Sequence, residues 1–156
     1  MPALTIREIC MAWLAGRIAS MPSGAPPDDP YAVTWGLVTR GRLGENADKK
    51  RYACGVYDTT ESKTQAMGKT TCVLRVVIEF RVWVDTGQDP GTETNMVLGE
   101  LQRRIREDIT CGDNALNLVE TGNEIDIDGP TDHQTQGAIF LNLQYRHHES
   151  DPRRRV

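Results

Sequence analysis

The chain has 156 residues, a formal net charge of -4 at pH 7, 38% hydrophobic residues and 26% charged residues. This length fits a single domain, which we place at residues 1–150, before an exposed basic tail at residues 151–156. The acidic balance argues against a general nucleic-acid binder, because such a protein needs a basic surface to displace counterions from phosphates. No apolar run approaches the ~18 to 20 residues of a membrane span, and the N-terminal segment carries too many charges for a secretory signal. We therefore expect synthesis in the cytoplasm.

In chain order, residues 5–21 show the apolar spacing of a helix, with Thr5 as its N-cap. A proline-rich linker follows at residues 22–30, and strands are predicted at residues 33–40 and 51–57, with a loop between them. Residues 58–69 (DTTESKTQAMGK) are polar and too many for a tight hairpin turn. We predict a long, functional or mobile loop there.

The next segment, residues 72–84, has apolar residues at every even position. Such alternation over thirteen residues predicts one strand of roughly 43 Å at ~3.3 Å per residue, longer than a domain of this size needs. Its odd positions include Arg75, Glu79, Arg81 and Trp83. The excess length suggests a surface that other chains use.

A second helix is predicted at residues 94–109, with Arg103, Arg104 and Arg106 on the side opposite its apolar stripe. Short strands at residues 115–120 and 124–127 and a last strand at residues 136–146 complete the pattern. The order of helix, strands, helix and strands predicts an α+β fold. We expect an antiparallel or mixed sheet of four to six strands with two helices packed on it.

The four cysteines show no CxxC pair and no histidine at zinc-finger spacing, so a structural zinc site is not expected. Free buried thiols are the default in a reducing compartment. Cys54 and Cys72 are predicted near the facing ends of neighbouring strands, which makes them the best candidates for a disulfide if the protein is oxidised. The sequence leaves open whether such a bond would form within or between subunits.

Motifs for catalysis and nucleotide binding are absent, including G-x-S-x-G, GxxxxGK[ST] and GxGxxG. The acidic stretch at residues 124–129 begins like a calcium-binding loop, but position twelve would be Thr135 instead of glutamate. An acidic turn is the favoured interpretation, and a weak divalent-cation contact is the alternative. Asp126 and Asp128 would share one side of a strand, without apolar neighbours to raise their pKa. We therefore expect no enzymatic activity, no cofactor and no resident metal.

Three segments, residues 73–84 (VLRVVIEFRVWV), 96–109 and 139–151 (IFLNLQYRHHESD), resemble the tail terminator, or tail completion, proteins of long-tailed bacteriophages. The N-terminal helix, the proline-rich linker and the polar hairpin loop extend this resemblance over most of the chain. It implies a small subunit that forms a hexameric ring on the tail tube. The ring would end tube polymerisation and offer a docking surface to the head connector, by steric means alone.

The resemblance also implies partners and a location. The tail tube protein and a head-tail connector or stopper protein would bind the ring, with no membrane and no specific nucleic-acid binding, although DNA would pass through the lumen. The protein would reside in the tail or neck of the virion, after assembly in the host bacterial cytoplasm. The resemblance equally allows another neck component, such as a head completion or stopper protein, or a minor tail protein. A different class, a module that binds a small ligand or nucleic acid through the arginine helix, is the remaining alternative.

Placed on this sequence, the resemblance assigns two kinds of contact residue. The first kind would reach toward the tail tube from the polar loop: Thr60, Glu61, Lys63 and Lys69. The second would contact neighbouring subunits: Arg75, Glu79, Arg81 and Trp83 of the long strand, with Arg103, Arg104 and Arg106 paired to acids that include Asp126 and Asp128. For each arginine the alternative is a solvated helix face.

Overall fold

A computed structural model describes residues 3–21, 28–127 and 133–156 of the chain. Its elements are α1 (Ile6–Ala19), β1 (Leu37–Thr39), the short 3-10 helix η2 (Glu45–Lys49), β2 (Tyr52–Ala66), β3 (Lys69–Trp83), α2 (Pro90–Arg106), β4 (Asn117–Asp126) and β5 (Gln134–His148). Among these residues the strands form a five-stranded sheet of order β1-β2-β3-β5-β4, in which β1 pairs parallel to β2 and the other pairs are antiparallel. The predicted α+β fold with a mixed sheet is confirmed.

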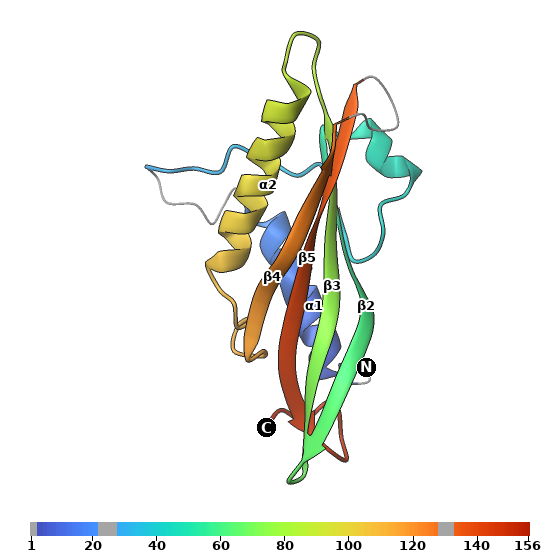
Figure 1. The fold of residues 1–156 in the computed structure, drawn as a ribbon, viewed down its shortest axis with the longest axis vertical. Coiled ribbons are helices and arrows are strands. Elements are labelled where there is room, and N and C mark those ends of the chain that lie inside the picture. The colour runs from blue at the N-terminus through green and yellow to red at the C-terminus, as the bar shows by residue number, and fades with distance from the viewer. Residues whose placement is uncertain (1–2, 22–27, 128–132) are drawn as a thin grey trace.

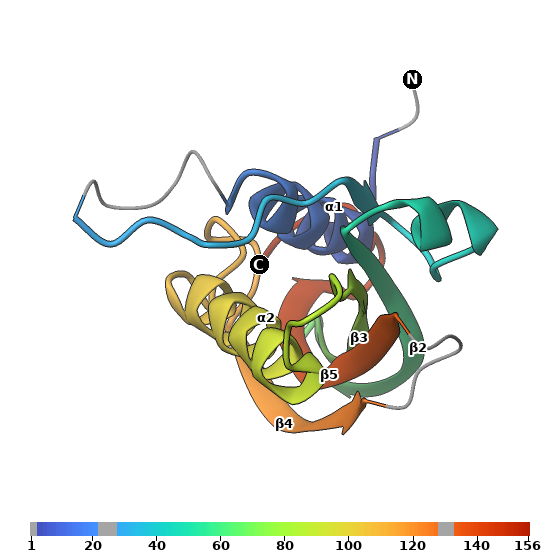
Figure 2. The same cartoon turned by 90° about the horizontal axis from the view of Figure 1, so that it is seen from above.

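Both helices lie on one side of the sheet, which curves around them (Figures 1 and 2). The even-numbered side chains of β3 from Cys72 to Val82 point to this inner side and are buried, as the alternation predicts. Ile139, Leu141 and Leu143 of β5 and the apolar stripes of the helices complete the core. The opposite face of the sheet, which we call the outer face, has no helix over it (Figure 1).

Strands β2 and β3 form a hairpin of two 15-residue strands joined by Met67 and Gly68. Both turn residues have positive φ, 53° and 76°, as a tight two-residue hairpin turn requires. The prediction of a long loop at residues 58–69 was therefore wrong. The segment lacks the alternation of apolar and polar residues that marks a strand, because both faces of β2 near the hairpin tip are exposed to solvent. Its backbone groups are nevertheless hydrogen-bonded to the neighbouring strand.

A β-bulge interrupts β2 between Asp58 and Glu61. Asp58 pairs with Val76 and Glu61 pairs with Leu74, and both partners point to the inner side of the sheet. Because a bulge shifts the side-chain alternation by one residue, it keeps both carboxylates on the side of α1.

The helix boundaries follow from local capping. The Thr5 hydroxyl accepts a hydrogen bond from the Glu8 amide at 3.3 Å, which confirms Thr5 as the N-cap of α1. Helix α2 begins four residues earlier than predicted, because Asp89 caps it and Pro90 occupies its first turn. The predicted strands at residues 115–120 and 124–127 are one strand, β4, with a bulge after Glu120.

A Cys54–Cys72 disulfide within one subunit is excluded. Cys54 lies opposite Phe80 in the β2–β3 ladder, eight residues along the strand from Cys72. At ~3.3 Å per residue this places the two cysteines roughly 26 Å apart, whereas a disulfide requires Cα atoms within about 7 Å. All four cysteines are buried and unbridged.

The C-terminal residues bend back onto the domain. The amide of Ile6 donates to the Pro152 carbonyl at 3.1 Å, and the amide of Glu149 donates to the Gly68 carbonyl at 2.9 Å. The side chains of residues 152–156 are exposed, but their backbone thus lies against the start of α1 near the end of the β2–β3 hairpin. The start of α1 and the C-terminus consequently both lie toward the hairpin end of the molecule (Figure 1).

We predict that Gly137→Ala destabilises the fold. A Cβ atom at residue 137 would lie 2.5 Å from Cζ of Phe80 and 2.9 Å from the Glu124 carbonyl oxygen, so the buried ring must move. Overpacking of this kind lowers the free energy of unfolding by ~1–3 kcal/mol, measurable by urea denaturation. Gly122→Ala is the matched control, because a Cβ there meets nothing within 4 Å. Equal stability of the two variants would contradict the steric argument.

Candidate functional site on the outer face of the sheet

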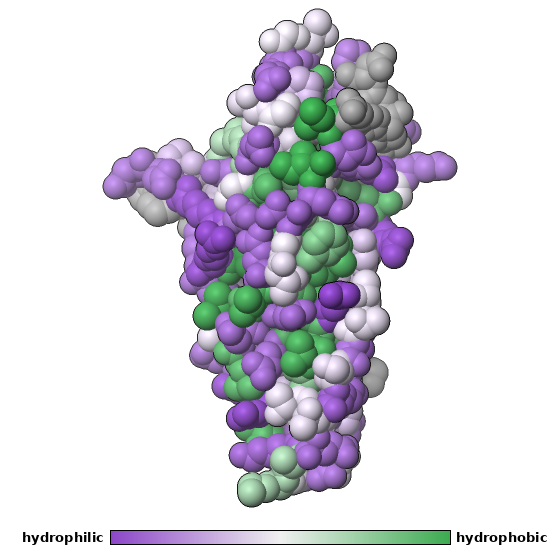
Figure 3. All heavy atoms as spheres, in the orientation of Figure 1, coloured by the Kyte–Doolittle hydropathy of each residue, from purple (hydrophilic) through white to green (hydrophobic). Residues whose placement is uncertain are grey.

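An apolar row crosses the middle of the outer face. Tyr57, Val77 and Phe140 are neighbours in register on β2, β3 and β5. Val77 is only 6% exposed although no helix covers it, because the surrounding side chains shield it. Tyr57 and Phe140 remain half-buried. Figure 3 shows hydrophobic side chains set among hydrophilic ones along this face.

Two hollows adjoin this apolar row. The first, of about 440 Å³, extends from Tyr57 and Phe140 toward Glu79, Arg81 and Asp126. The second, of about 580 Å³, is lined by Tyr57, Val77 and Phe140 together with Arg42, Thr59, Arg75 and Thr121. The outer face therefore combines an apolar centre with charged residues of both signs: the arginines and Glu79 lie on or near β2 and β3, and Asp126 lies on β4.

The structure brings three predicted contact residues to one hollow: Glu79, Arg81 and Asp126. The Glu79 carboxylate accepts a hydrogen bond from the Leu43 amide, and Arg81 donates to the Gly44 carbonyl at 3.4 Å. Both side chains thus also hold the loop after β1. Asp126 accepts a hydrogen bond from Gln136 at 3.1 Å, across the β4–β5 ladder.

The other two predicted residues of β3 lie on either side of this hollow. Arg75 is exposed and lines the second hollow. Trp83 is 37% exposed and stacks on His133, with ring centroids 5.7 Å apart. Asp128, the remaining acid of the predicted contact set, lies outside the described residues.

Arg104 was wrongly predicted to lie at an interface. It is 4% exposed, because it turns inward and donates to the Arg17 carbonyl at 3.0 Å and to the Ser20 hydroxyl at 3.1 Å. It also forms an ion pair with Glu107 at 2.7 Å. Arg104 thus connects α2 to the C-terminal end of α1. The helical pattern could not reveal this, because the partners are backbone and hydroxyl groups from a distant segment.

The two other arginines of α2 have partners within the chain. Arg103 pairs with Asp29 at 3.1 Å and lies over the Tyr31 ring, 4.4 Å from its centroid. Arg106 pairs with Glu120 at 3.4 Å. These contacts involve Asp29 and Glu120, outside the acidic segment at residues 124–132 that was predicted to pair with them.

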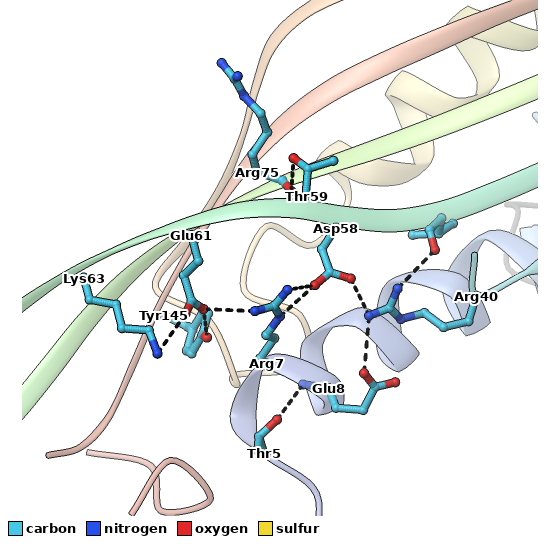
Figure 4. Close-up of polar contacts among 11 residues, drawn as sticks. Thr5, Arg7, Glu8, Arg40, Asp58, Thr59, Glu61, Lys63, Arg75 and Tyr145 are labelled. Atoms are coloured by element: carbon cyan, nitrogen blue, oxygen red, sulfur yellow. Dashed lines mark hydrogen bonds and ion pairs between the residues drawn. The ribbon is translucent and has the colours of Figure 1, made fainter. Parts of the chain in front are cut away.

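A charged network surrounds Asp58, and no pattern in the sequence indicated it. The Asp58 carboxylate accepts hydrogen bonds from Arg7 of α1 at 2.7 Å and from Arg40 at 2.6 Å, and Arg40 also contacts Glu8 at 3.3 Å. Figure 4 shows Asp58 pointing between the two guanidinium groups. Charged residues near the start of a predicted helix were visible in the sequence, but their partner lay in what was expected to be a loop.

The second carboxylate of the bulge extends this network. Glu61 accepts a hydrogen bond from the Tyr145 hydroxyl of β5 and pairs with Lys63 at 2.9 Å (Figure 4). Its side chain is only 10% exposed. Glu61, predicted to reach a partner from a loop, instead joins β2 to β5 inside the subunit.

The network also sets the pKa of its acids. Burial alone would raise the pKa of Asp58, but hydrogen bonds from Arg7 and Arg40 outweigh burial, so the pKa lies below its ordinary value. Burial likewise opposes ionisation of Glu61, and the hydrogen bonds from Tyr145 and Lys63 lower its pKa despite this. Burial and the bond to Glu61 raise the pKa of Tyr145. Asp58 and Glu61 are therefore structural carboxylates that stay ionised at neutral pH.

The remaining residues of the predicted loop lie on the hairpin. Thr60 sits in the bulge and is exposed, as are Lys63 and Lys69 on the facing strands. At the tip, Met67 is 99% exposed. An apolar side chain so fully in water adds nothing to the fold of the subunit.

Within the described ranges, no group of three or more His, Cys, Asp or Glu side chains is arranged to hold a metal ion. None of the helices described is both long enough and apolar enough to cross a membrane. No protein-family model matches the sequence, and no curated protein matches it significantly.

We predict that Asp58→Asn lowers stability at pH 7 and that this loss shrinks in acid. Because the folded-state pKa of Asp58 is depressed, its contribution is present above the unfolded-state pKa near ~4 and is lost as pH falls through the folded value. The expected cost at pH 7 is ~1.5–3 kcal/mol, the range for hydrogen bonds to charged groups.

Urea denaturation of wild type and variant at pH 7, 5, 4 and 3 measures this effect. Glu45→Gln serves as the control because Glu45 is exposed, and its difference from wild type should stay small at every pH. A stability difference for Asp58→Asn that does not change with pH would contradict the assignment.

Proposed function

We propose that this chain is a structural virion protein of the tail terminator type, whose subunits form a ring on the phage tail tube. The observation that carries this proposal is the outer face of the sheet, where an apolar row and two hollows lie uncovered beside arginines and carboxylates. Long strands that leave such a face open are typical of subunits completed by assembly. The resemblance to tail terminators supports the specific role.

A second copy of the chain is the occupant that best fits the outer face. Arg42 and Arg75 line the second hollow, whereas Glu124 and Asp126 of β4 line the first hollow together with Glu79 and Arg81 of β3. A neighbour related by rotation in a ring would bring the β4 side of one subunit toward the β2 side of the next. Opposite charges would set the register, and the apolar row would supply most of the contact energy.

The two ends of the elongated subunit suit different axial partners (Figure 1). At the hairpin end, Lys69 lies opposite His148, near the exposed arginines of the C-terminal residues. The other end carries Asp85, Asp89 and Glu93 around the start of α2, and Lys49, Lys50 and Arg51 lie beside Asp85. We place the tail tube protein at the hairpin end and the head connector or stopper protein at the end where α2 begins.

The proposed mechanism is steric. A ring bound to the last layer of tube subunits covers the surface on which the next layer would assemble, so growth stops without any covalent step. The same outer face would also serve another neck protein, and identification of the bound partner separates that role from termination. A ligand-binding module built on the arginines of α2 is disfavoured, because Arg103, Arg104 and Arg106 each have a partner within the chain.

We predict that Val119→Glu prevents assembly of the ring. Val119 is 47% exposed and points to the outer face of β4, where a new carboxylate would be desolvated by the neighbouring subunit. Native mass spectrometry at micromolar concentration, alone and with tail tube protein, should show oligomers for wild type and monomers for the variant.

The matched control for assembly is Ile109→Glu, because Ile109 is 42% exposed and lies just beyond α2, away from the outer face. It should assemble as wild type does. A strictly monomeric wild type in both conditions, or normal assembly of folded Val119→Glu, would refute the proposal.

We predict that Met67→Asp leaves the fold and the ring intact but weakens capping of the tube. Aspartate tolerates the positive φ of this turn position, and the side chain contributes nothing to the core. Polymerisation of purified tail tube protein, followed by tube length in electron micrographs, should stop with wild type and continue with the variant. Ile127→Asp, 52% exposed at the other end, is the control and should still cap. Equal capping by both variants would exclude the hairpin tip from the tube contact.

A further inference from the structure

Two cysteines that the sequence did not pair lie together in the core. Cys10 of α1 and Cys111 of the turn after α2 are each fully buried in the same core cluster. A hydrogen bond between the two thiols lowers the pKa of Cys10 and raises the pKa of Cys111. They are separated by roughly 100 residues in the chain, so only the tertiary fold brings them together.

The packing around this thiol pair is close. Residue 112 is a glycine with φ of 63°, and a Cβ atom there would lie 2.8 Å from Nε1 of Trp13. Trp13 follows Cys10 by three residues, so it lies on the same face of α1. The turn therefore rests directly on this face of the helix, with Cys111 beside Cys10 and Gly112 beside Trp13.

The turn itself is held by its own hydrogen bonds. The Ala115 amide donates to the Thr110 carbonyl at 2.7 Å, and the Gly112 amide donates to the Asp108 carboxylate at 3.0 Å. Cys111 adopts a positive φ of 50° within it. These bonds hold the turn in a conformation in which Cys111 is fully buried in the core cluster that also contains Cys10.

We propose that Cys10 and Cys111 are a latent disulfide site, which closes when the folded protein meets a small-molecule disulfide such as oxidised glutathione. One thiol loses its proton and attacks the small disulfide, which forms a mixed disulfide and releases one small thiol. The second cysteine then loses its proton and attacks the mixed disulfide, which forms the Cys10–Cys111 bond and releases the second small thiol. The small disulfide is thereby reduced by two electrons to two thiols, and it takes up the two protons.

Reaction requires the turn at residues 110–114 to open transiently, because neither thiol is exposed in the closed state. Such opening is local: the turn connects α2 to β4 and belongs to neither the helix nor the strand. The other two cysteines do not compete within one subunit, since Cys54 and Cys72 are far apart along the β2–β3 ladder.

The bond would tie α1 to the connection between α2 and β4 and would close a very long loop. A cross-link over such a span restricts the unfolded chain more than the folded one, so the oxidised protein should be harder to unfold. A particle that leaves the reducing cytoplasm provides the oxidising conditions in which such a bond persists. The site does not depend on the proposed ring.

The test is incubation of native wild-type protein with oxidised glutathione, followed by denaturation, alkylation of free thiols and intact mass measurement. We expect two of the four cysteines to become resistant to alkylation, a Cys10–Cys111 peptide in the digest, and a higher melting temperature that reverts with reductant. The double variant Cys54→Ala/Cys72→Ala should cross-link in the same way, and Cys111→Ala should not cross-link at all.

Peptide mapping of wild type decides the question even if a variant fails to fold. Four alkylated cysteines after prolonged incubation would overturn the proposal, as would a bond that includes Cys54 or Cys72. Stable glutathione adducts without an internal bond, or cross-linking only in denaturant, would also overturn it.

Discussion

The structure depends on the pairing of β3 with two neighbours along its whole length. Each residue from Lys69 to Trp83 has a partner on β5, and nearly the entire strand is also paired with β2. Two ladders of this length leave no freedom of register, because a slip by one residue would turn every buried side chain of β3 outward. The helices, the core and the uncovered outer face all take their positions from this one strand.

The bulge in β2 places two carboxylates, Asp58 and Glu61, on the inner side of the sheet where the apolar core ends. Carboxylates on the inner side are costly unless they are hydrogen-bonded, and Asp58 and Glu61 obtain their partners from Arg7, Arg40 and Tyr145. These bonds connect β2 with α1, the segment after β1, and β5. The polar half of the hairpin is thus anchored where the apolar core ends, while the tip beyond it stays in water.

The division of the sheet into a covered and an uncovered face is the link to the proposed role. The inner face is closed by two helices, and the outer face retains Tyr57, Val77 and Phe140 beside hollows with charged rims. Arg104 belongs to the covered side, because its guanidinium group is hydrogen-bonded to the end of α1 and is not available to a partner protein. The surfaces proposed for assembly are therefore the outer face and the two ends of the subunit, not the arginine side of α2.

The sequence by itself determined the α+β class, the Thr5 cap and the buried face of β3, because these follow from local periodicity and from side-chain bonds to nearby backbone. It did not reveal that residues 58–66 form a strand, because this polar segment is held in an extended conformation only by its hydrogen bonds to β3. The inward turn of Arg104, the network at Asp58 and the meeting of Cys10 with Cys111 were likewise decided by the tertiary structure. Each joins residues far apart in the chain, and one-dimensional spacing carries no information about which distant groups the fold brings within bonding distance.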